Sequence, residues 1–457
     1  MRTLFSVLLL LALVTPVRAR SAEVRKTPRS APAAAMDALL AGKFRADQPG
    51  AVVLAVKEGR TLFRKAYGLA SVELGVPVKP DTVFRIASTT KQFTAAAVLE
   101  LVEEGRVDLK APLRRYLPEL PAGWAAITVE HLLTHTSGLR EYSRAPDFRM
   151  EEPVTPAGLL ARLEGWPLEF EPGTRFAYNN SGYILLGLLV ERLSGQPYET
   201  FLKEHFLQPL GLTRTAFPTH GELVPGLASP YSSGPRPAPV VSPSPAGGLV
   251  SNADDLAAWT LALHGGKVLS PASLQVMTTP FHLKDGQDTR YGLGMRIGEL
   301  HGQPYIHHSG DNPGYHVQVA ALPRSRVAVV VLMNGEEGEV SPEFLAKRLA
   351  ALAIGQPLTE PTPSVVSVEV LQALVGRYRS GDAVRTIRLR DGHLYSVLGE
   401  GPPGLIQPLS PTEFFFPDNS DLHLRFTLEA GRAVAVTRLS DGGSPQVFLR
   451  EPAESKP

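Results

Sequence analysis

The sequence predicts a mixed α/β domain at residues 35–354, followed by a small all-β antiparallel domain at 368–452. Apolar runs of strand length occur near both ends of the first region, and longer runs with helical periodicity lie between them. A Pro-rich stretch, expected to be a linker at 355–367, interrupts this pattern. Beyond it, short β-like runs alternate with turn residues, which is typical of a barrel or a sandwich.

The elements of the first domain follow from apolar periodicity, turn residues and helix caps. A hairpin turns at Lys57-Glu58-Gly59-Arg60, and the run after Ser88 is apolar on nearly all faces, as expected of a central buried helix. Gly195 ends one later helix, and Asn252 begins another. In chain order we expect a helix at 35–44, strands at 50–56 and 61–66, a helix at about 88–105, a helical turn at 128–133, helices at 181–193 and 252–264, antiparallel strands at 305–308, 315–322 and 327–334, and an amphipathic helix at 342–354 that packs on the sheet.

The second domain is predicted from runs that alternate polar and apolar residues. Turn signals such as Arg390-Asp391-Gly392 and Ala430-Gly431 separate these runs. The expected strands lie at 383–389, 393–398, 413–417, 422–428, 433–439 and 446–449.

The N-terminus has the pattern of a secretory signal peptide. Arg2 precedes an apolar run at 4–14 that is too short to span a bilayer, and Val17-Arg18-Ala19 fits a small-x-small cleavage site. We therefore expect a signal peptide at 1–19, a polar linker at 20–34 and a periplasmic or secreted protein. A buried N-terminal helix is the alternative interpretation.

The composition argues against several classes of protein. The net charge of +1 argues against a nucleic-acid partner and against binding through a basic membrane patch. The chain has no cysteine, so disulfides, thiolate catalysis and cysteine-based zinc sites are excluded. No stretch after the N-terminus is long and apolar enough to be a transmembrane segment.

The run Ser88-Thr89-Thr90-Lys91 is the strongest indication of chemistry. In the first turn of a helix, Ser88 and Lys91 lie on the same face. A serine hydroxyl becomes a nucleophile when a neighbouring base takes its proton, and a lysine with a lowered pKa can be that base. N–H groups at a helix start also favour developing negative charge. The alternative is a helix-capping serine followed by a solvent-exposed lysine.

Two further motifs lie where functional residues are common. Tyr178-Asn179-Asn180 precedes a helix, and a phenol near an ammonium can transfer protons while an amide can hold a substrate carbonyl. The alternative here is an ordinary polar loop that caps the helix. His308-Ser309-Gly310, followed by Asp311, ends a predicted strand, where glycine lets a substrate backbone approach the strand edge.

In this order, the three motifs resemble those of the serine β-lactamase and penicillin-binding-protein superfamily. The resemblance covers residues 35–354 and includes the stretches at 132–139 and 246–251. The class C-like branch, with its D-Ala-D-Ala carboxypeptidases, D-aminopeptidases and esterases, is the most similar. The resemblance implies an α/β sandwich, with an antiparallel sheet flanked by helices and an all-helical lobe, and a site between them. The run at 374–378 resembles the start of lipocalin-like β-domains often appended to this family.

The resemblance also implies a role for each motif residue. Ser88 would be acylated, and Lys91 and Tyr178 would share proton transfer. The backbone N–H groups of Ser88 and Asp311 would form the oxyanion hole. β-Lactamases usually carry lysine at the position of His308, so histidine there looks more like a peptidase or an esterase. The substrate-binding residues would be Asn180, His308, Ser309, Gly310 and Asp311.

We therefore expect an exported serine hydrolase that forms an acyl-enzyme on Ser88 and cleaves a D-amino-acid peptide or amide, or a small ester. The alternatives are a carboxylesterase, a weak β-lactamase, or a non-catalytic penicillin- or peptidoglycan-binding protein. The partner would be a small molecule or peptide, peptidoglycan fragments included. No cofactor or metal is expected, because His131 and His135 have zinc-protease spacing but leucine replaces the required glutamate.

Overall fold

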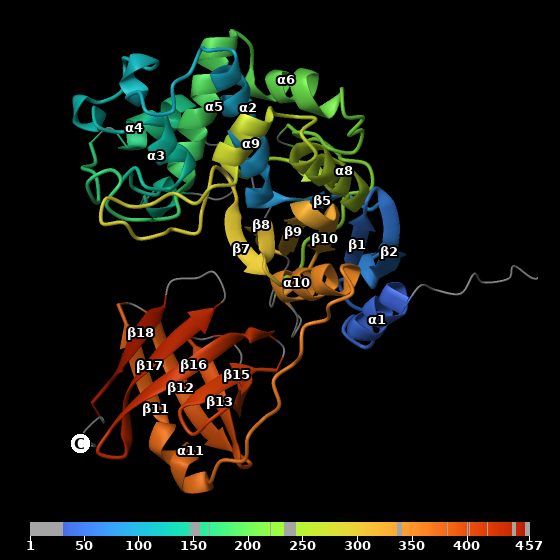
Figure 1. The fold of residues 1–457 in the computed structure, drawn as a ribbon, viewed down its shortest axis with the longest axis vertical. Helices are drawn as coiled ribbons and strands as arrows, with labels where there is room; N and C mark the ends of the chain where they lie inside the picture. The colour runs from blue at the N-terminus through green and yellow to red at the C-terminus, as the bar shows by residue number, and fades with distance from the viewer. Residues whose placement is uncertain are drawn as a thin grey trace, which may run out of the picture.

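The computed structural model describes residues 31–145, 148, 156–163, 165–219, 221–232, 244–335, 341–381, 383–399, 401, 403–417, 419–440 and 445–452. The expected signal peptide and most of the expected linker at 20–34 lie outside these ranges. Among the described helices, none is long and apolar enough to cross a membrane. Figure 1 shows a helix-rich part and a β-barrel joined by an extended segment.

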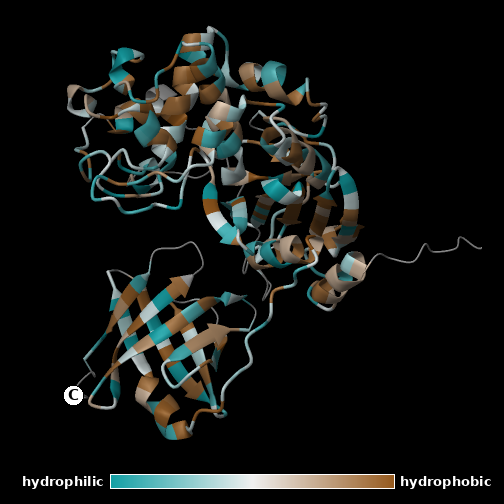
Figure 2. Ribbon diagram, in the orientation of Figure 1, coloured by the Kyte–Doolittle hydropathy of each residue, from teal (hydrophilic) through white to brown (hydrophobic). Residues whose placement is uncertain are grey.

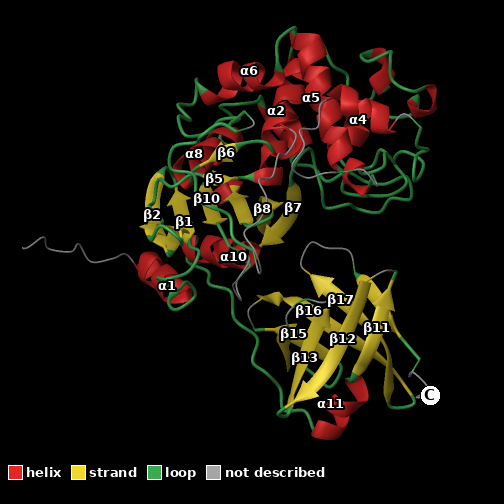
Figure 3. Ribbon diagram, turned by 180° about the vertical axis from the view of Figure 1, so that it is seen from behind, coloured by secondary structure: helices red, strands yellow, loops and turns green. Residues whose placement is uncertain are grey.

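The first domain is built on a six-stranded antiparallel sheet with the strand order β2-β1-β10-β9-β8-β7 (Figure 3). The N-terminal hairpin therefore joins strands from the end of the domain, and Val53 lies opposite Val331 across the β1–β10 pair. This pairing brings residues that are far apart in the sequence into one sheet. The strands are β1 (Ala51–Lys57), β2 (Arg60–Tyr67), β7 (Arg296–Leu300), β8 (Gln303–Asn312), β9 (Tyr315–Leu322) and β10 (Val327–Met333).

Helices cover both faces of this sheet, so its central strands are apolar along their length. In β1, Val52 and Leu54 face the core shared with the helical lobe, whereas Val53 and Ala55 face a second core. Full burial of one such valine stabilises the fold by about 1.5–3 kcal/mol. The covering helices are α8 (Ala253–His264) on the first face, and α1 (Ala31–Leu40) and α10 (Pro342–Ala353) on the second.

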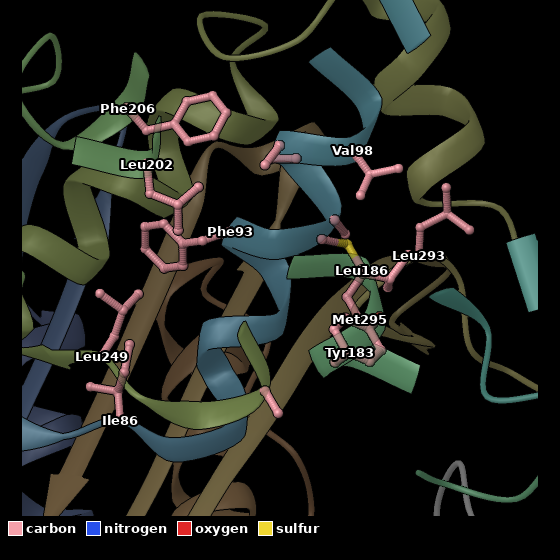
Figure 4. Close-up of a cluster of buried hydrophobic side chains, with 14 of the residues drawn as sticks. Ile86, Phe93, Val98, Tyr183, Leu186, Leu202, Phe206, Leu249, Leu293 and Met295 are labelled. Atoms are coloured by element: carbon pink, nitrogen blue, oxygen red, sulfur yellow. The ribbon is translucent and has the colours of Figure 1, made fainter. Parts of the chain in front are cut away.

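The helix α2 (Lys91–Glu103) is the centre of the helical lobe and is buried on nearly every side, which confirms the expected central helix. Phe93 and Val98 point to opposite sides of it, and Leu202 and Phe206 lie beside Phe93 (Figure 4). Phe93 also stacks on Trp259 of α8, with ring centroids 3.9 Å apart. The other helices are α3 (Val129–Leu133), α4 (Pro156–Leu163), α5 (Asn180–Ser194), α6 (Tyr198–Leu202), α7 (Ser244–Gly247) and α9 (Pro271–Met277), and two short strand pairs are β3 (Leu69–Ser71) with β4 (Val76–Pro77) and β5 (Phe84–Arg85) with β6 (Val250–Ser251).

The second domain is a closed antiparallel barrel in which β11 pairs with β18, so the barrel form of the expected all-β fold is confirmed. Bands of hydrophilic and hydrophobic residues alternate along its strands (Figure 2), and Tyr378, Phe414 and Phe448 are fully buried in its interior. The helix α11 (Val368–Leu374) adds Leu371 and Leu374 to the same core. The strands are β11 (Gly376–Ser380), β12 (Ala383–Arg390), β13 (His393–Leu398), β14 (Gly404–Pro408), β15 (Glu413–Phe416), β16 (Asn419–Glu429), β17 (Arg432–Ser440) and β18 (Gln446–Arg450).

Several boundaries differ from those expected. The first helix begins at Ala31 and ends at Leu40, earlier than the expected 35–44, so the last residues of the expected linker are helical. Gly42, with a φ of +73°, takes the left-handed conformation that ends such a helix. The strand expected at 305–308 extends to Asn312, so the whole His308-Ser309-Gly310 motif lies within β8.

One buried arginine of the first domain forms hydrogen bonds with the interdomain segment and with the barrel. Arg348 of α10 is 5% exposed and donates to Glu360 of the interdomain segment at 3.0 Å. It also donates to Ser420 at 2.5 Å and to Asp421 at 3.3 Å, both in β16 of the barrel. The junction is therefore polar, and each domain has its own apolar core among the described residues.

A chain that ends at Gly355 is expected to fold without the barrel. The barrel core shares no residue with the two cores of the first domain, and Arg348 would become solvated when its partners are removed. Circular dichroism and thermal unfolding of the shortened chain should show native helix content and one cooperative transition. Arg348→Gln in the shortened chain is the matched control and should change little. Insoluble or non-cooperatively unfolding protein would show that the domains depend on each other.

Candidate active site

A strained turn presents Ser88 at the start of α2. Ser88 lies in the 3₁₀ turn η1 (Ala87–Thr90), directly before Lys91. The preceding Ala87 has a φ of +43°, a left-handed conformation that costs a non-glycine residue about 1–3 kcal/mol. Ser88 is partly exposed, whereas Lys91 is fully buried. The turn therefore leaves the Ser88 hydroxyl accessible to solvent, whereas the Lys91 amine is buried away from water.

Gly310 of β8 packs directly against this turn. A Cβ atom on Gly310 would lie 2.0 Å from the Ile86 carbonyl oxygen, so only glycine allows the approach. The strand β7 pairs with β8 only from Gln303 to His307. The later part of β8, which carries the rest of the motif, therefore lies beside Ser88 with one edge that β7 does not cover.

The Lys91 amine has three polar neighbours. Its Nζ lies 2.7 Å from the Ala246 carbonyl oxygen, 2.8 Å from Asn180 Oδ1 and 3.1 Å from Ser88 Oγ. Burial lowers the pKa of Lys91 to about 7, although the carboxylate of Glu141 opposes that effect. A neutral amine is therefore well populated near pH 7.

The neighbours of Lys91 fix how a neutral amine would be oriented. The Ala246 and Asn180 oxygens can only accept hydrogen bonds, so the two N–H groups of the amine point to them. Its lone pair is then left for the Ser88 hydroxyl, the one neighbour of the three that can donate. This is the arrangement that a base needs in order to take the serine proton.

The Tyr178 ring covers the same amine. Lys91 Nζ lies 4.9 Å from the ring centroid, and the buried Tyr178 hydroxyl lies beside the Ser88 side chain. Burial raises the pKa of Tyr178 well above its ordinary value, and the adjacent Ser88 side chain opposes this. The phenol is therefore protonated near neutral pH and is suited to donating a proton.

Asn180 is held by a carboxylate that the sequence analysis did not single out. The backbone N–H of Asn180 donates to Glu141 at 2.6 Å, and its side-chain amide donates to the same carboxylate at 3.4 Å. The amide oxygen of Asn180 thereby faces Lys91. Glu141 follows the stretch at 132–139, and no sequence pattern linked it to Asn180.

His308 is fully surrounded by protein. Its Nε2 lies 2.8 Å from the Tyr291 hydroxyl, and its Nδ1 lies 2.6 Å from the Ser309 carbonyl oxygen. Burial, with the charges of Lys91 and Arg296, holds the pKa of His308 well below its ordinary value. The imidazole is therefore neutral and carries no cation at this position.

The structure thus gathers Ser88, Lys91, Tyr178, Asn180 and His308 into one cluster. Ser309 and Gly310 contribute backbone beside it, and the side chain of Asp311 turns to His316 at 2.8 Å. His131 forms a capping box with Thr128 at the start of α3. No group of three or more metal-ligating side chains occurs within the described ranges.

An antiparallel sheet, a helical lobe and a serine–lysine pair between them are the arrangement of serine hydrolases with a β-lactamase fold. Residues 33–354 match the Beta-lactamase family, and the chain belongs to that family. The expected superfamily and fold class are therefore confirmed, and the chain is an enzyme of the hydrolase class.

Relatives with different activities match this chain. Penicillin-binding protein 4* of Bacillus subtilis (strain 168) is 26% identical over 432 residues, which cover 86% of this chain and 93% of that protein. D-Aminopeptidase of Gluconobacter oxydans (strain 621H) is 27% identical over 354 residues, which cover 72% and 63%. Esterase EstB of Burkholderia gladioli is 38% identical over 190 residues, which cover 37% and 47%.

One similar solved structure includes the region of the barrel. The octameric penicillin-binding protein homologue from Pyrococcus abyssi superposes with a TM-score of 0.66 at 26% identity. The match covers 91% of this chain and 99% of that one. The combination of both domains is therefore shared with a solved structure.

Proposed function

We propose that this protein is an exported serine hydrolase that cleaves D-amino-acid peptides or amides through an acyl-enzyme on Ser88. The orientation of the buried Lys91 amine carries this proposal, because its lone pair faces the Ser88 hydroxyl when the amine is neutral. The similarity to a D-aminopeptidase supports the substrate class. The signal-peptide pattern at 1–19 supports export, and mass spectrometry of the mature N-terminus tests cleavage after Ala19.

In the acylation step, Ser88 Oγ bonds to the substrate carbonyl carbon while its proton passes to Lys91 Nζ. The backbone N–H groups of Ser88 and Asp311 would stabilise the oxyanion. The bond to the leaving group then breaks, and that group takes a proton from the Tyr178 hydroxyl, which Lys91 replenishes. Asn180 would hold the substrate amide. Water then attacks the ester carbon and gives a proton to Lys91, which passes it to Ser88 Oγ as the ester bond breaks and the acid is released.

A polar cavity supports a peptide-like substrate. The cavity, of about 270 Å³, lies between the domains. The first domain supplies Arg296, Ser309 and Glu343 to its wall, and the barrel supplies Asp421 and Arg438. None of Ser88, Lys91 and Tyr178 lines the cavity. Ser309 does, and it lies in the part of β8 whose edge β7 does not cover, so a substrate bound along that edge would meet the cavity wall. Charges of both signs suit the ionised groups of a peptide better than an apolar ester.

A substrate panel tests the proposal. We expect the full chain to hydrolyse D-aminoacyl p-nitroanilides at least about tenfold faster than their L-isomers, and Ser88 to gain the mass of a penicillin. Because His308 supplies no cation for a β-lactam carboxylate, kcat/KM on a chromogenic cephalosporin should stay below about 10⁵ M⁻¹s⁻¹. A higher value would show that His308 does not limit β-lactam turnover.

A carboxylesterase is the second candidate, and the similarity to EstB favours it. Hydrolysis of p-nitrophenyl esters without hydrolysis of any D-aminoacyl amide would assign the protein to that class. Absence of both hydrolysis and Ser88 acylation would reject the proposed mechanism.

A further inference from the structure

A chain of four hydrogen bonds, three of them buried and the last partly buried, crosses the site behind the serine–lysine pair. It begins at the Asn179 backbone N–H, which donates to His135 Nδ1 at 3.1 Å. His135 Nε2 lies 3.2 Å from the Tyr291 hydroxyl, which lies 2.8 Å from His308 Nε2. The chain ends where His308 Nδ1 meets the Ser309 carbonyl oxygen at 2.6 Å.

The two backbone ends determine which ring nitrogen of each histidine carries the hydrogen. Because the Asn179 N–H can only donate, Nδ1 of neutral His135 is the acceptor and its Nε2 carries the hydrogen. Because the Ser309 carbonyl can only accept, Nδ1 of His308 carries the hydrogen and its Nε2 is the acceptor. The Tyr291 hydroxyl then accepts from His135 and donates to His308, although the Tyr183 hydroxyl is a second acceptor within its reach. Each of the four bonds is satisfied in one arrangement.

The chain connects the two walls of the site. Asn179 lies between Tyr178 and Asn180 in the motif, and its side chain accepts from Gly182 and donates to Leu139 in the helical lobe. Ser309 lies in β8 of the sheet. His135 has a φ of +58°, a conformation that costs a non-glycine residue about 1–3 kcal/mol and persists when the surroundings hold it in place.

We propose that Tyr291 and His135 are positioning residues that fix His308 as its neutral Nδ1–H tautomer and hold the Tyr178-Asn179-Asn180 loop against β8. The inference depends on the proposed function only in the experiments that measure turnover. If His308 were protonated at Nε2, the Tyr291 hydroxyl would have to point away from it, towards Tyr183 or His135. A turn towards His135 would move the His135 hydrogen to Nδ1, which would face the Asn179 N–H. The chain therefore opposes protonation of His308.

Among the groups that act on His308, the cations oppose its protonation, whereas the Ser309 carbonyl favours it. Lys91 and Arg296 are the cations whose charge disfavours a second cation, and His307 adds a smaller effect of the same sign. The buried phenols remain protonated because burial raises their pKa values. The titratable and charged groups that surround the chain are Lys91, Glu141, Tyr178, Tyr183, Arg296, His307 and Asp311.

The tautomer of His308 tests the chain without any substrate. Long-range ¹H–¹⁵N spectra of the ¹⁵N-histidine-labelled full chain, assigned with His308→Asn, distinguish Nδ1–H from Nε2–H imidazole. We expect His308 to be Nδ1–H, and His135 to be Nε2–H, with neither ring titrating between about pH 5 and 8. A wild-type His308 in the Nε2–H form, or one that titrates in this range, would overturn the proposal. This result stands whether or not the enzyme acts on the substrates tested.

Tyr291→Phe tests the positioning role. It keeps the ring but removes the hydroxyl that links the two histidines, so we expect His308 to titrate in the spectra and kcat to fall about tenfold or more, with KM changed less than about twofold. The pH profile of kcat should gain a second ionisation on its acid side. The matched control is Tyr198→Phe, which removes an equally buried hydroxyl bonded to Thr94 at 2.7 Å, outside the chain. If the two variants have the same pH profile and the same kcat, the positioning role is wrong.

Discussion

Ser88→Ala is expected to abolish turnover of every substrate that the enzyme accepts. No other described group at the site combines partial solvent exposure with a base at 3.1 Å, so no second nucleophile can replace the hydroxyl. The loss should reach at least about 10⁴-fold in kcat, because both acylation and its base assistance disappear. Stopped assays on an activated ester, together with intact-protein mass spectrometry, measure the loss of turnover and of the acyl adduct.

The fold should survive this substitution. Ser88 is partly exposed and its side chain fills no apolar core, so thermal unfolding should shift by no more than a few degrees. Ser194→Ala, at the C-terminal end of α5, is a matched serine substitution away from the site and should retain full activity. A normal kcat in Ser88→Ala would show that Ser88 is not the nucleophile.

Lys91→Met is expected to have the second largest effect. Methionine fills a similar volume but has no lone pair for the serine proton, so kcat/KM should fall by about 10³-fold, within the usual range for a general base. In the unmodified enzyme, kcat/KM should rise as the pH passes through about 7 and then level off. The sign follows from the lowered pKa, because protons removed above this value leave the amine neutral and able to accept.

The Lys91→Met variant shows which group produces the acid limb of the kcat/KM pH profile. Lys91→Met should lose the limb near pH 7, and its residual activity should depend little on pH in that range. Lys203→Met changes a lysine outside the site and should leave the limb in place. A limb that persists unchanged in Lys91→Met would show that another group titrates there.

Local sequence patterns predicted the elements whose signal lies within one segment. The run after Ser88 is apolar all round, and α2 is buried all round. Asn252 was expected to cap a helix, and it does so by accepting from Asp255. The barrel strands β11 and β14 were not predicted, because Arg377 and Arg379 break the apolar run of the first and Gly404 and Pro408 bound the second. Their pairing with neighbours, and not their composition, makes them strands.

The site residues that belong to a local sequence motif could be predicted. Those that reach the site through contacts between distant segments could not. Ser88 and Lys91 are one turn apart, so their proximity follows from helical geometry. Tyr291 reaches His135 across 156 positions of sequence, and Glu141 reaches Asn180 across 39. Nothing in either segment alone specifies these contacts. The left-handed φ values of Ala87 and His135 also have no sequence signal, since neither residue is a glycine.

The closed barrel has a consequence for the behaviour of the chain in solution. A strand at the edge of an open sheet offers unpaired N–H and C=O groups to other molecules and can seed aggregation. The pairing of β11 with β18 leaves no such edge among the described barrel strands, so the C-terminal domain offers no strand edge there for pairing with other molecules. The open sheet protects one of its own edges differently, because the edge strand β2 carries Arg60, Arg64 and Lys65.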